Sequence, residues 1–317
     1  MKRIALALVM IMVLLLVGST AVAEAPAVKL GILAPQTTHG WVAAVAYNAE
    51  VRAKELLDAG AIAEYKLFTS ANETEMTSQL DDLKLWGANA IVAFPQWTGM
   101  EVPIQAAIDE GIYVVNFDIE INADGVYRLS GNNEDMGVQG AHYIAEKLGG
   151  EGKVVIMNVP SSGSVSELRG KGFTDTLAAE YPGIEIIGTY ATAFTREDGL
   201  KDMADILVAN AQIDAVYSMD DETSIGALQA IKEAGRTDIK AITGGGGCQE
   251  YFNLMLSEEY QDIWVQSALY SPAMVKDAIN MAMDIVGGAE VEPVKILGTT
   301  IVDRSNAADF LDANTPY

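Results

Sequence analysis

The sequence predicts an α/β fold in which the chain forms two similar lobes, each built around a parallel sheet. From residue 28 onward, short apolar runs alternate with longer amphipathic runs, which is the pattern of strands and helices in α/β proteins. This alternation runs through the chain twice, before about residue 131 and again after Gly152. No Pro- or Ser-rich linker separates the halves, so we expect several short crossings between the lobes rather than one tether.

Residues 1–23 have the pattern of a secretory signal peptide. Lys2 and Arg3 precede fourteen uninterrupted apolar residues, Ile4 to Val17, and the small-residue run GSTAVA follows. The apolar run is shorter than the roughly 20 residues that a transmembrane helix needs. We therefore expect cleavage after Ala23 and a soluble protein that is exported to the periplasm.

The strands are placed on the short apolar runs and the helices in the intervals between them. Most of the short runs are continuously apolar, as expected of strands that are covered on both faces. The predicted strands are residues 28–34, 62–68, 89–94, 112–117, 153–158, 184–190, 213–218, 239–243 and 262–268, and a short strand VYRLS leads from the first half to the second. The predicted helices are residues 40–58, 73–87, 99–110, 133–148, 164–181, 196–210, 221–235, 249–258 and 271–287.

Composition and charge exclude several classes of protein. The 317 residues carry a formal net charge of −24, and an acidic surface repels the phosphates of nucleic acids. Cys248 is the only cysteine, and His39 and His142 are the only histidines, so an intramolecular disulfide is excluded and a Cys/His zinc site is not expected. We therefore expect no nucleic-acid partner, no metal and no cofactor.

Sequence signatures of enzymes are missing from the chain. The run GGGG at 244–247 lacks the Lys-Ser/Thr of a P-loop, and no G-x-G-x-x-G follows the first strand. Ser164 lacks the second glycine of a G-x-S-x-G nucleophile elbow. The carboxylates of Asp118, Glu167 and Asp220 leave a metal or glycosidase site open, but carboxylates often serve binding alone, which is the role we favour.

Ligand-binding residues are expected just after the strands, because parallel sheets bind ligands beyond the carboxyl ends of their strands. Aromatic rings, carboxylates and amides recur at these positions. Rings can cover the C–H faces of a neutral polyhydroxy ligand, while carboxylates accept hydrogen bonds from its hydroxyls. The candidate ligand-binding residues are Thr38, His39, Trp41, Phe94, Trp97, Asp118, Glu167, Phe194, Asp220 and Gln266.

The aromatic candidates also have a packing interpretation. Trp41 and Trp97 could pack between helices, but their position just beyond strand ends favours a pocket. Trp86 and Trp264 lie within a predicted helix and a predicted strand, which favours packing for these two. His39 begins a helix and is expected at the polar rim of the site.

The candidate aspartates could instead cap local structure. Asp118 ends the strand IYVVNFD and could cap the turn that follows it. Asp220 and Asp221 precede the helix ETSIGALQAIKEAG, so one of them is expected to be its N-cap. Only one of the two need face the ligand, and we favour Asp220.

Five segments carry a resemblance to a known family. They are KLGILAPQTTHGW near the start, NFD at 116–118, SGNNEDMGVQGAHYIAEKL at 130–148, LRGKGF at 168–173 and AVYSMDDETSIGALQAIKEAG at 215–235. With these segments the chain resembles the periplasmic substrate-binding proteins of ABC sugar importers, of the ribose- and galactose-binding type. Sugar-responsive repressors share that fold, but they carry an N-terminal helix-turn-helix where this sequence has an export signal.

The resemblance implies the type I periplasmic binding protein fold, with two Rossmann-like lobes joined by a three-crossing hinge. It places residues 24–131 and about 269–296 in the first lobe, and residues 132–268 and about 297–317 in the second. It also implies a non-enzymatic monomer that closes around its ligand and delivers it to the membrane permease of an ABC importer. A chemoreceptor is a second partner that the resemblance leaves open.

Functional positions of the family carry over unevenly. Thr38, Trp41, Asp118, Phe194 and Asp220 match its ligand-contacting positions. Ile119 and Glu167 stand where the family often has arginines, and Gly-Gly-Gly replaces the usual G-F-D after the strand at 239–243.

The lost arginines predict an uncharged ligand, because buried carboxylates repel anions. Arg196 is the one nearby candidate cation, and its place in the run TRED favours the surface. We therefore expect a small neutral polyol, pentose, hexose or furanosyl compound. An amine-bearing ligand such as an amino sugar is the alternative within binding proteins, and a secreted sugar-processing hydrolase is the alternative from another class.

Overall fold

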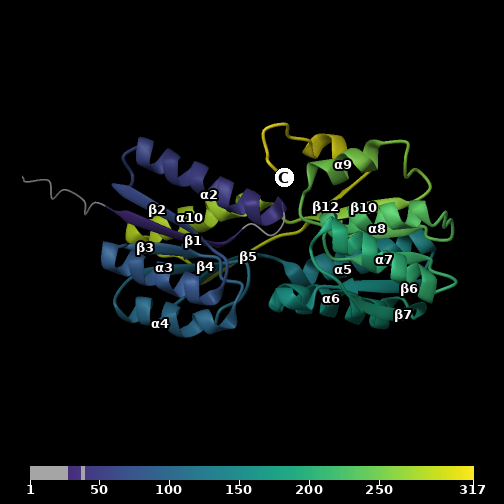
Figure 1. The fold of residues 1–317 in the computed structure, drawn as a ribbon, viewed down its shortest axis with the longest axis horizontal. Helices are drawn as coiled ribbons and strands as arrows, with labels where there is room; N and C mark the ends of the chain where they lie inside the picture. The colour runs from purple at the N-terminus through teal and green to yellow at the C-terminus, as the bar shows by residue number, and fades with distance from the viewer. Residues whose placement is uncertain (1–27, 37–39) are drawn as a thin grey trace, which may run out of the picture.

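The computed structural model describes residues 28–36 and 40–317. The expected signal peptide and its cleavage after Ala23 lie outside these residues. The described chain forms two lobes that lie side by side along the long axis of the molecule, each with a six-stranded sheet (Figure 1). We call the lobe that contains the first strand the N-terminal lobe and the other the C-terminal lobe.

The sheet of the N-terminal lobe has the strand order β11-β5-β4-β3-β1-β2, and all its neighbouring strands are parallel. The strands are β1 (Lys29–Pro35), β2 (Glu64–Ser70), β3 (Ala90–Ala93), β4 (Tyr113–Phe117), β5 (Tyr127–Gly131) and β11 (Val294–Leu297). Helices α2 (Gly40–Asp58) and α10 (Val275–Val286) cover one face, and α3 (Glu73–Trp86) and α4 (Glu101–Asp109) cover the other.

The sheet of the C-terminal lobe has the order β12-β10-β9-β8-β6-β7, in which only β12 runs antiparallel to its neighbour. The strands are β6 (Glu151–Asn158), β7 (Gly183–Ala191), β8 (Ala215–Ser218), β9 (Ala241–Gly245), β10 (Trp264–Leu269) and β12 (Thr300–Asp303). Helices α5 (Asn133–Leu148) and α6 (Ser164–Glu180) cover one face, while α7 (Arg196–Ala209), α8 (Asp221–Glu233) and α9 (Gln249–Leu256) cover the other.

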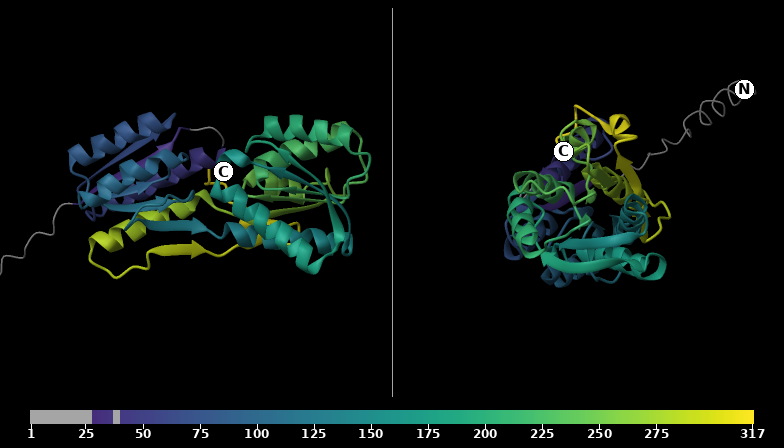
Figure 2. Two further views of the ribbon diagram at one scale, coloured as in Figure 1. Left: turned by 90° about the horizontal axis from the view of Figure 1, so that it is seen from below. Right: turned by 90° about the vertical axis from the view of Figure 1, so that its right-hand side faces the viewer.

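The chain crosses between the lobes three times within the described residues. It leaves the first sheet after β5, returns between β10 and α10, and crosses again between β11 and β12. The view from below shows these segments running side by side between the lobes (Figure 2). The predicted α/β fold, with two parallel-sheet lobes and a three-crossing hinge, is confirmed.

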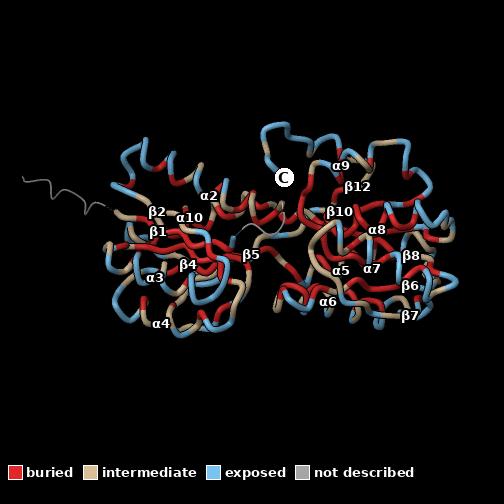
Figure 3. Tube along the Cα trace, in the orientation of Figure 1, coloured by how far each residue is buried: buried red, intermediate tan, exposed pale blue. Residues whose placement is uncertain are grey.

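Each lobe encloses its own buried strands and helix faces (Figure 3). All strands predicted from the apolar runs are present, and their ends differ from the prediction by two residues or fewer. Strands β11 and β12 were not predicted, because both are four-residue edge strands and β11 is largely exposed, so neither has a long apolar run. In the described part of the chain, no helix has the length and apolar character needed to cross a bilayer.

Candidate functional site

A cavity of about 530 Å³ lies between the lobes, at the carboxyl ends of their strands. This volume falls within the range of small-molecule sites in proteins. Six of the predicted residues line the cavity: Trp41, Phe94, Trp97, Asp118, Phe194 and Asp220. Residues that were selected because they follow strands in the two lobes therefore line one shared cavity.

Trp41 and Phe94 line the N-terminal side of the cavity and pack on a third ring, Phe117, which is fully buried behind them. Trp41 stacks on Phe117 at a centroid distance of 6.3 Å and an angle of 4°, and Phe94 meets both rings edge-on. The indole N–H of Trp41 donates a 2.7 Å hydrogen bond to the backbone oxygen of Tyr270. Trp41 thus serves in packing and in lining the cavity, and it offers a ligand ring surface rather than its N–H.

Asp118 has an unusual backbone conformation. Its φ of 67° makes it the one non-glycine residue with positive φ among the described residues. The Asn116 amide holds the turn around it, because it donates to the Ile119 oxygen at 2.9 Å and accepts from the Ile121 N–H at 3.1 Å. Such strained residues cluster at functional sites.

The Asp118 carboxylate is buried and tied to the hinge. The Tyr270 hydroxyl donates to its Oδ1 at 2.5 Å and is also hydrogen bonded to Ser130 Oγ at 3.0 Å. Ser130 lies in β5 just before the first crossing, and Tyr270 lies just after β10 in the second. Burial raises the pKa of Asp118 above its usual value, so a ligand hydroxyl that donates to it would replace lost solvation.

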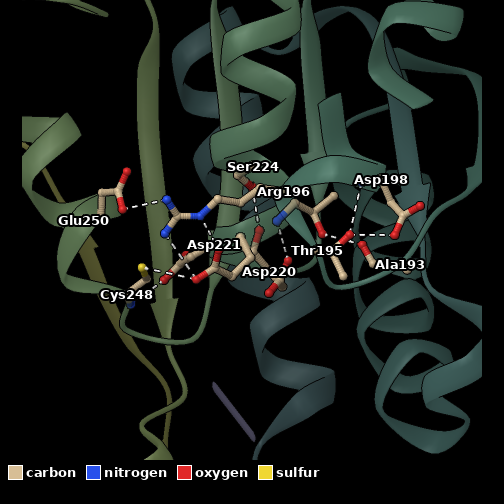
Figure 4. A network of polar contacts seen from close by, with 11 residues as sticks. Ala193, Thr195, Arg196, Asp198, Asp220, Asp221, Ser224, Cys248 and Glu250 are labelled. Atoms are coloured by element: carbon tan, nitrogen blue, oxygen red, sulfur yellow. Dashed lines mark hydrogen bonds and ion pairs between the residues drawn. The ribbon is translucent and has the colours of Figure 1, made fainter. Parts of the chain in front are cut away.

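Asp220 and Asp221 have different roles at the start of α8 (Figure 4). Asp220 is the N-cap, accepting from the Thr223 N–H at 2.7 Å, and it also lines the cavity. Asp221 Oδ2 accepts hydrogen bonds from the N–H groups of Gly247 and Cys248 and from the Ser267 hydroxyl, at 2.8 to 2.9 Å. Burial raises the pKa of Asp220 to about 6 and that of Asp221 to about 7.

The expectation that the site lacks a certain cation is wrong, because Arg169 lines the cavity. Its Nε donates to Asn133 Oδ1 at 2.8 Å, and its Nη1 donates to the Met219 oxygen at 2.7 Å. The guanidinium also lies over the Tyr270 ring at 4.8 Å. The cavity therefore presents two carboxylates and one fixed guanidinium.

Glu167 and Gln266 do not line the cavity, so the structure does not support them as ligand-binding residues. Val165 and Arg169 are four residues apart on one face of α6 and both line the cavity, whereas Glu167 lies between them on the opposite face and is exposed. Gln266 is buried in the middle of β10, away from its carboxyl end. Thr38 and His39 lie outside the described residues.

Tyr270 takes the place in the cavity lining that we expected for Gln266. It follows the end of the same strand. The sequence signal was present, since the rule of reading past each strand end selects Tyr270 once β10 is known to end at Leu269. Arg169 had a weaker signal, because only the helical spacing from Val165 places it toward the cleft.

Arg196 lies outside the cavity, as the sequence favoured. It begins α7, pairs with Glu222, and donates from Nη1 to Glu250 Oε2 at 2.6 Å (Figure 4). Trp86 and Trp264 are also absent from the cavity lining, and each lies under a lysine ammonium, Lys66 at 4.8 Å and Lys147 at 4.7 Å. Across residues 28–36 and 40–317, no group of three or more His, Cys, Asp or Glu side chains is arranged to hold a metal ion.

Two α/β lobes that share one cavity across a three-segment hinge define a bilobal ligand-binding protein. The periplasmic binding protein domain family matches residues 30–290. The chain therefore belongs to this family, and the resemblance inferred from its motifs is confirmed. As a family member it is a non-enzymatic solute-binding protein of the kind that serves ABC transporters.

Two curated relatives illustrate the similarity. The chain is 30% identical over 251 residues to the xylitol-binding protein of Mycolicibacterium smegmatis, covering 76% of this chain and 70% of the relative. It is 28% identical over 197 residues to the D-allose-binding periplasmic protein of Escherichia coli, covering 58% of this chain and 63% of the relative.

Solved structures are similar over nearly the whole described chain. An ABC transporter solute-binding protein from Mycobacterium smegmatis with bound glycerol has a TM-score of 0.80 at 25% identity, covering 91% of this chain and 98% of that one. A periplasmic solute-binding protein from Actinobacillus succinogenes with bound D-allose also has a TM-score of 0.80, at 20% identity, covering 89% and 99% of the two chains. The second likeness concerns the fold alone.

Proposed function

We propose that this protein captures one small neutral sugar or polyol between its lobes and delivers it to the membrane permease of an ABC importer. The observation that carries the proposal is the pairing of Asp118 and Asp220, which line one cavity from opposite lobes beside aromatic rings. A ligand whose hydroxyls donate to both carboxylates makes contacts that only the closed arrangement offers. That differential affinity shifts the population toward closure.

The charges of the cavity favour a neutral ligand over a sugar phosphate. Asp118 and Asp220 repel an anion, and Arg169 already donates to Asn133 and to the Met219 oxygen. Relatives of this chain bind xylitol and D-allose by name, and both are uncharged polyhydroxy compounds. An amine-bearing ligand is the second candidate, because the two carboxylates exceed the single guanidinium.

We also propose that residues 1–23 are removed on export and that the protein acts as a monomer in the periplasm. The apolar run and the A-x-A pattern at Ala21 to Ala23 support the first part. Mass spectrometry of the protein purified from a periplasmic fraction should give a chain that begins at Glu24. A membrane-bound form that retains Met1 would contradict this localisation.

A thermal-shift screen tests the ligand class. Ligands that bind only the native state raise its stability by mass action, by about 2.7 kcal/mol at a concentration of 100 times Kd. The panel should contain xylitol, D-ribose, D-allose, myo-inositol, glucosamine and ribose 5-phosphate. We expect stabilisation by at least one neutral compound, while stabilisation by glucosamine alone would favour the amine-bearing class.

A further inference from the structure

Tyr317 is buried between the two lobes, although most of residues 311–316 are exposed. Its exposed fraction is 6%, whereas Leu311 to Asn314 are all exposed. In two views, the segment that leads to this residue leaves the C-terminal lobe and brings Tyr317 to a position between the lobes (Figures 1 and 2). A tyrosine buried after an exposed stretch requires a specific partner surface.

The segment that carries Tyr317 is fixed to the C-terminal lobe through Gln249 at the start of α9. The Gln249 amide donates to the Phe310 oxygen at 3.2 Å and accepts from the Asp312 N–H at 2.7 Å. The Phe310 ring also meets the Phe252 ring of α9 at 6.3 Å. Asp312 then turns the chain, because its Oδ1 accepts from the Asn314 N–H at 2.8 Å. Residues 311–317 therefore move with the C-terminal lobe.

The Tyr317 ring touches both lobes where glycines leave room for it. A Cβ placed on Gly40, the first residue of α2, would lie 3.1 Å from Tyr317 Cδ2. A Cβ placed on Gly246, in the loop after β9, would lie 2.8 Å from Tyr317 Oη and 3.2 Å from its Cε1. The ring thus fills space between α2 of one lobe and the Gly246 loop of the other.

The hydroxyl of Tyr317 makes its burial less favourable. Its Oη is buried without a hydrogen-bond partner among the described residues. Burial, together with the nearby carboxylates of Asp220, Asp221 and Glu222, raises the pKa of Tyr317 well above its usual value, so the phenol keeps its proton. A buried donor without a partner is unfavourable, whereas exposure to water would satisfy it.

We propose that residues 311–317 form a latch in which Tyr317, carried by the C-terminal lobe, docks against α2 and holds the lobes together before ligand binds. Opening of the hinge separates α2 from the Gly246 loop, so the anchored Tyr317 must leave α2 and expose its ring. Loss of this apolar contact disfavours opening, and the unsatisfied hydroxyl keeps the latch reversible. This inference goes beyond the proposed function, because it concerns the ligand-free protein.

The test is the distance between the lobes in the ligand-free full chain. Nitroxide labels on Val102→Cys in α4 and Val208→Cys in α7 report on opposite lobes, since these side chains are 77% and 90% exposed. Cys248 is 4% exposed and burial raises the pKa of its thiol to about 12, so it stays unlabelled at neutral pH. Pulsed electron resonance then gives the populations of short and long separations.

Tyr317→Ala should move the population from short toward long separations, and Tyr317→Phe should move it the other way, because the ring stays and the unsatisfied hydroxyl is removed. Gln249→Ala should resemble Tyr317→Ala, because it removes the two hydrogen bonds that hold Phe310 and Asp312 to α9 while the Tyr317 ring is unchanged. Equal distributions for all four proteins would overturn the latch, as would opening by Tyr317→Phe. The measurement uses no ligand, so its outcome is separate from whether a neutral sugar binds.

Discussion

Asp118 combines three properties that belong together at a binding site: burial, a positive φ, and a carboxylate that is bonded to the hinge through Tyr270. The surrounding turn holds the residue in a conformation that an L-amino acid seldom adopts. A ligand that bonds to this carboxylate therefore acts on a group already linked to Tyr270 in the second crossing and, through the Tyr270 hydroxyl, to Ser130 just before the first. In the proposed function, recognition and hinge closure therefore share one set of side chains.

Asp118→Asn tests the carboxylate without disturbing the backbone, because Asn also tolerates positive φ. Loss of charge-assisted hydrogen bonds should weaken binding by about 2 kcal/mol, or about 30-fold. The measurement is calorimetry with the most stabilising neutral compound of the screen. Asp262→Asn, at an exposed position, is the matched control. Equal affinity for Asp118→Asn and the control would remove Asp118 from the site.

The buried aspartates predict how stability depends on pH. Burial raises the pKa of Asp220 to about 6 and of Asp221 to about 7, above the value near 4 of an unfolded aspartate. The folded state therefore binds protons more tightly, and the stability from these groups is complete below about pH 4 and is lost as the pH rises through about 7.

The unfolding midpoint should thus be higher at pH 5 than at pH 8, by at least about 2 °C, the shift that about 1 kcal/mol causes in a protein of this size. Asp221→Asn should reduce this difference, because it removes one titrating carboxyl while keeping an oxygen for the three donors. Thermal unfolding followed by circular dichroism at pH 5 and pH 8 measures this difference in midpoint for both proteins. A midpoint that rises from pH 5 to pH 8 would contradict the conclusion that burial raises the pKa values of Asp220 and Asp221.

At the scale of single residues, the sequence identified positions after strands better than positions on helices. Phe94, Asp118 and Asp220 follow strands, and strand ends in a parallel sheet share one edge, so their convergence was predictable. Glu167 and Arg169 lie on a helix, where a shift of two residues reverses the face. Only the orientation of α6 against its sheet decides which of them reaches the cavity, and that orientation depends on packing.

At the scale of elements, helices α5 and α6 approach closely through glycines. A Cβ on Gly172 would lie 3.1 Å from the Val138 nitrogen and closer still to the Glu134 oxygen. Gly170, in the same helix, would bring its Cβ no closer than 3.6 Å to Met219 Cε, which is ordinary contact. These two glycines share the motif LRGKGF but meet different surroundings.

Gly172→Ala should therefore destabilise the protein by about 1–3 kcal/mol, because overpacking outweighs the gain of about 1 kcal/mol that alanine brings to a helix. Gly170→Ala should be neutral or stabilising by up to about 1 kcal/mol. Urea denaturation of both variants gives the comparison. Equal stability of the two would show that α6 packs less tightly on α5 than the structure indicates.

The positions of strands could be predicted from the sequence where burial on both faces requires a continuous apolar run. The interior strands are continuous apolar runs because helices cover both their faces, whereas the edge strands β11 and β12 have no such requirement and were missed. The lobe boundaries at residues 131/132, about 268/269 and about 296/297 stay predictions.

At the scale of the whole molecule, the net charge is not expected to set the affinity for a neutral ligand. The chain carries a net charge of −24, which favours solubility and gives a long-range field that repels anions. A neutral ligand has no net charge for that field to act on, so its affinity depends on contacts within the cavity. In the proposed function, the hinge converts these contacts into closure, because Asp118 and Asp220 line the cavity from different lobes.

The most direct test of neutral-ligand capture is calorimetry at low and high salt, with xylitol, D-ribose, D-allose and myo-inositol compared against ribose 5-phosphate. We expect one neutral compound to bind one to one, with an affinity that changes little with ionic strength, since a neutral ligand has no long-range Coulomb attraction to screen. Tight, salt-sensitive binding of ribose 5-phosphate that Arg169→Met abolishes, with no binding of any neutral compound, would contradict this proposal.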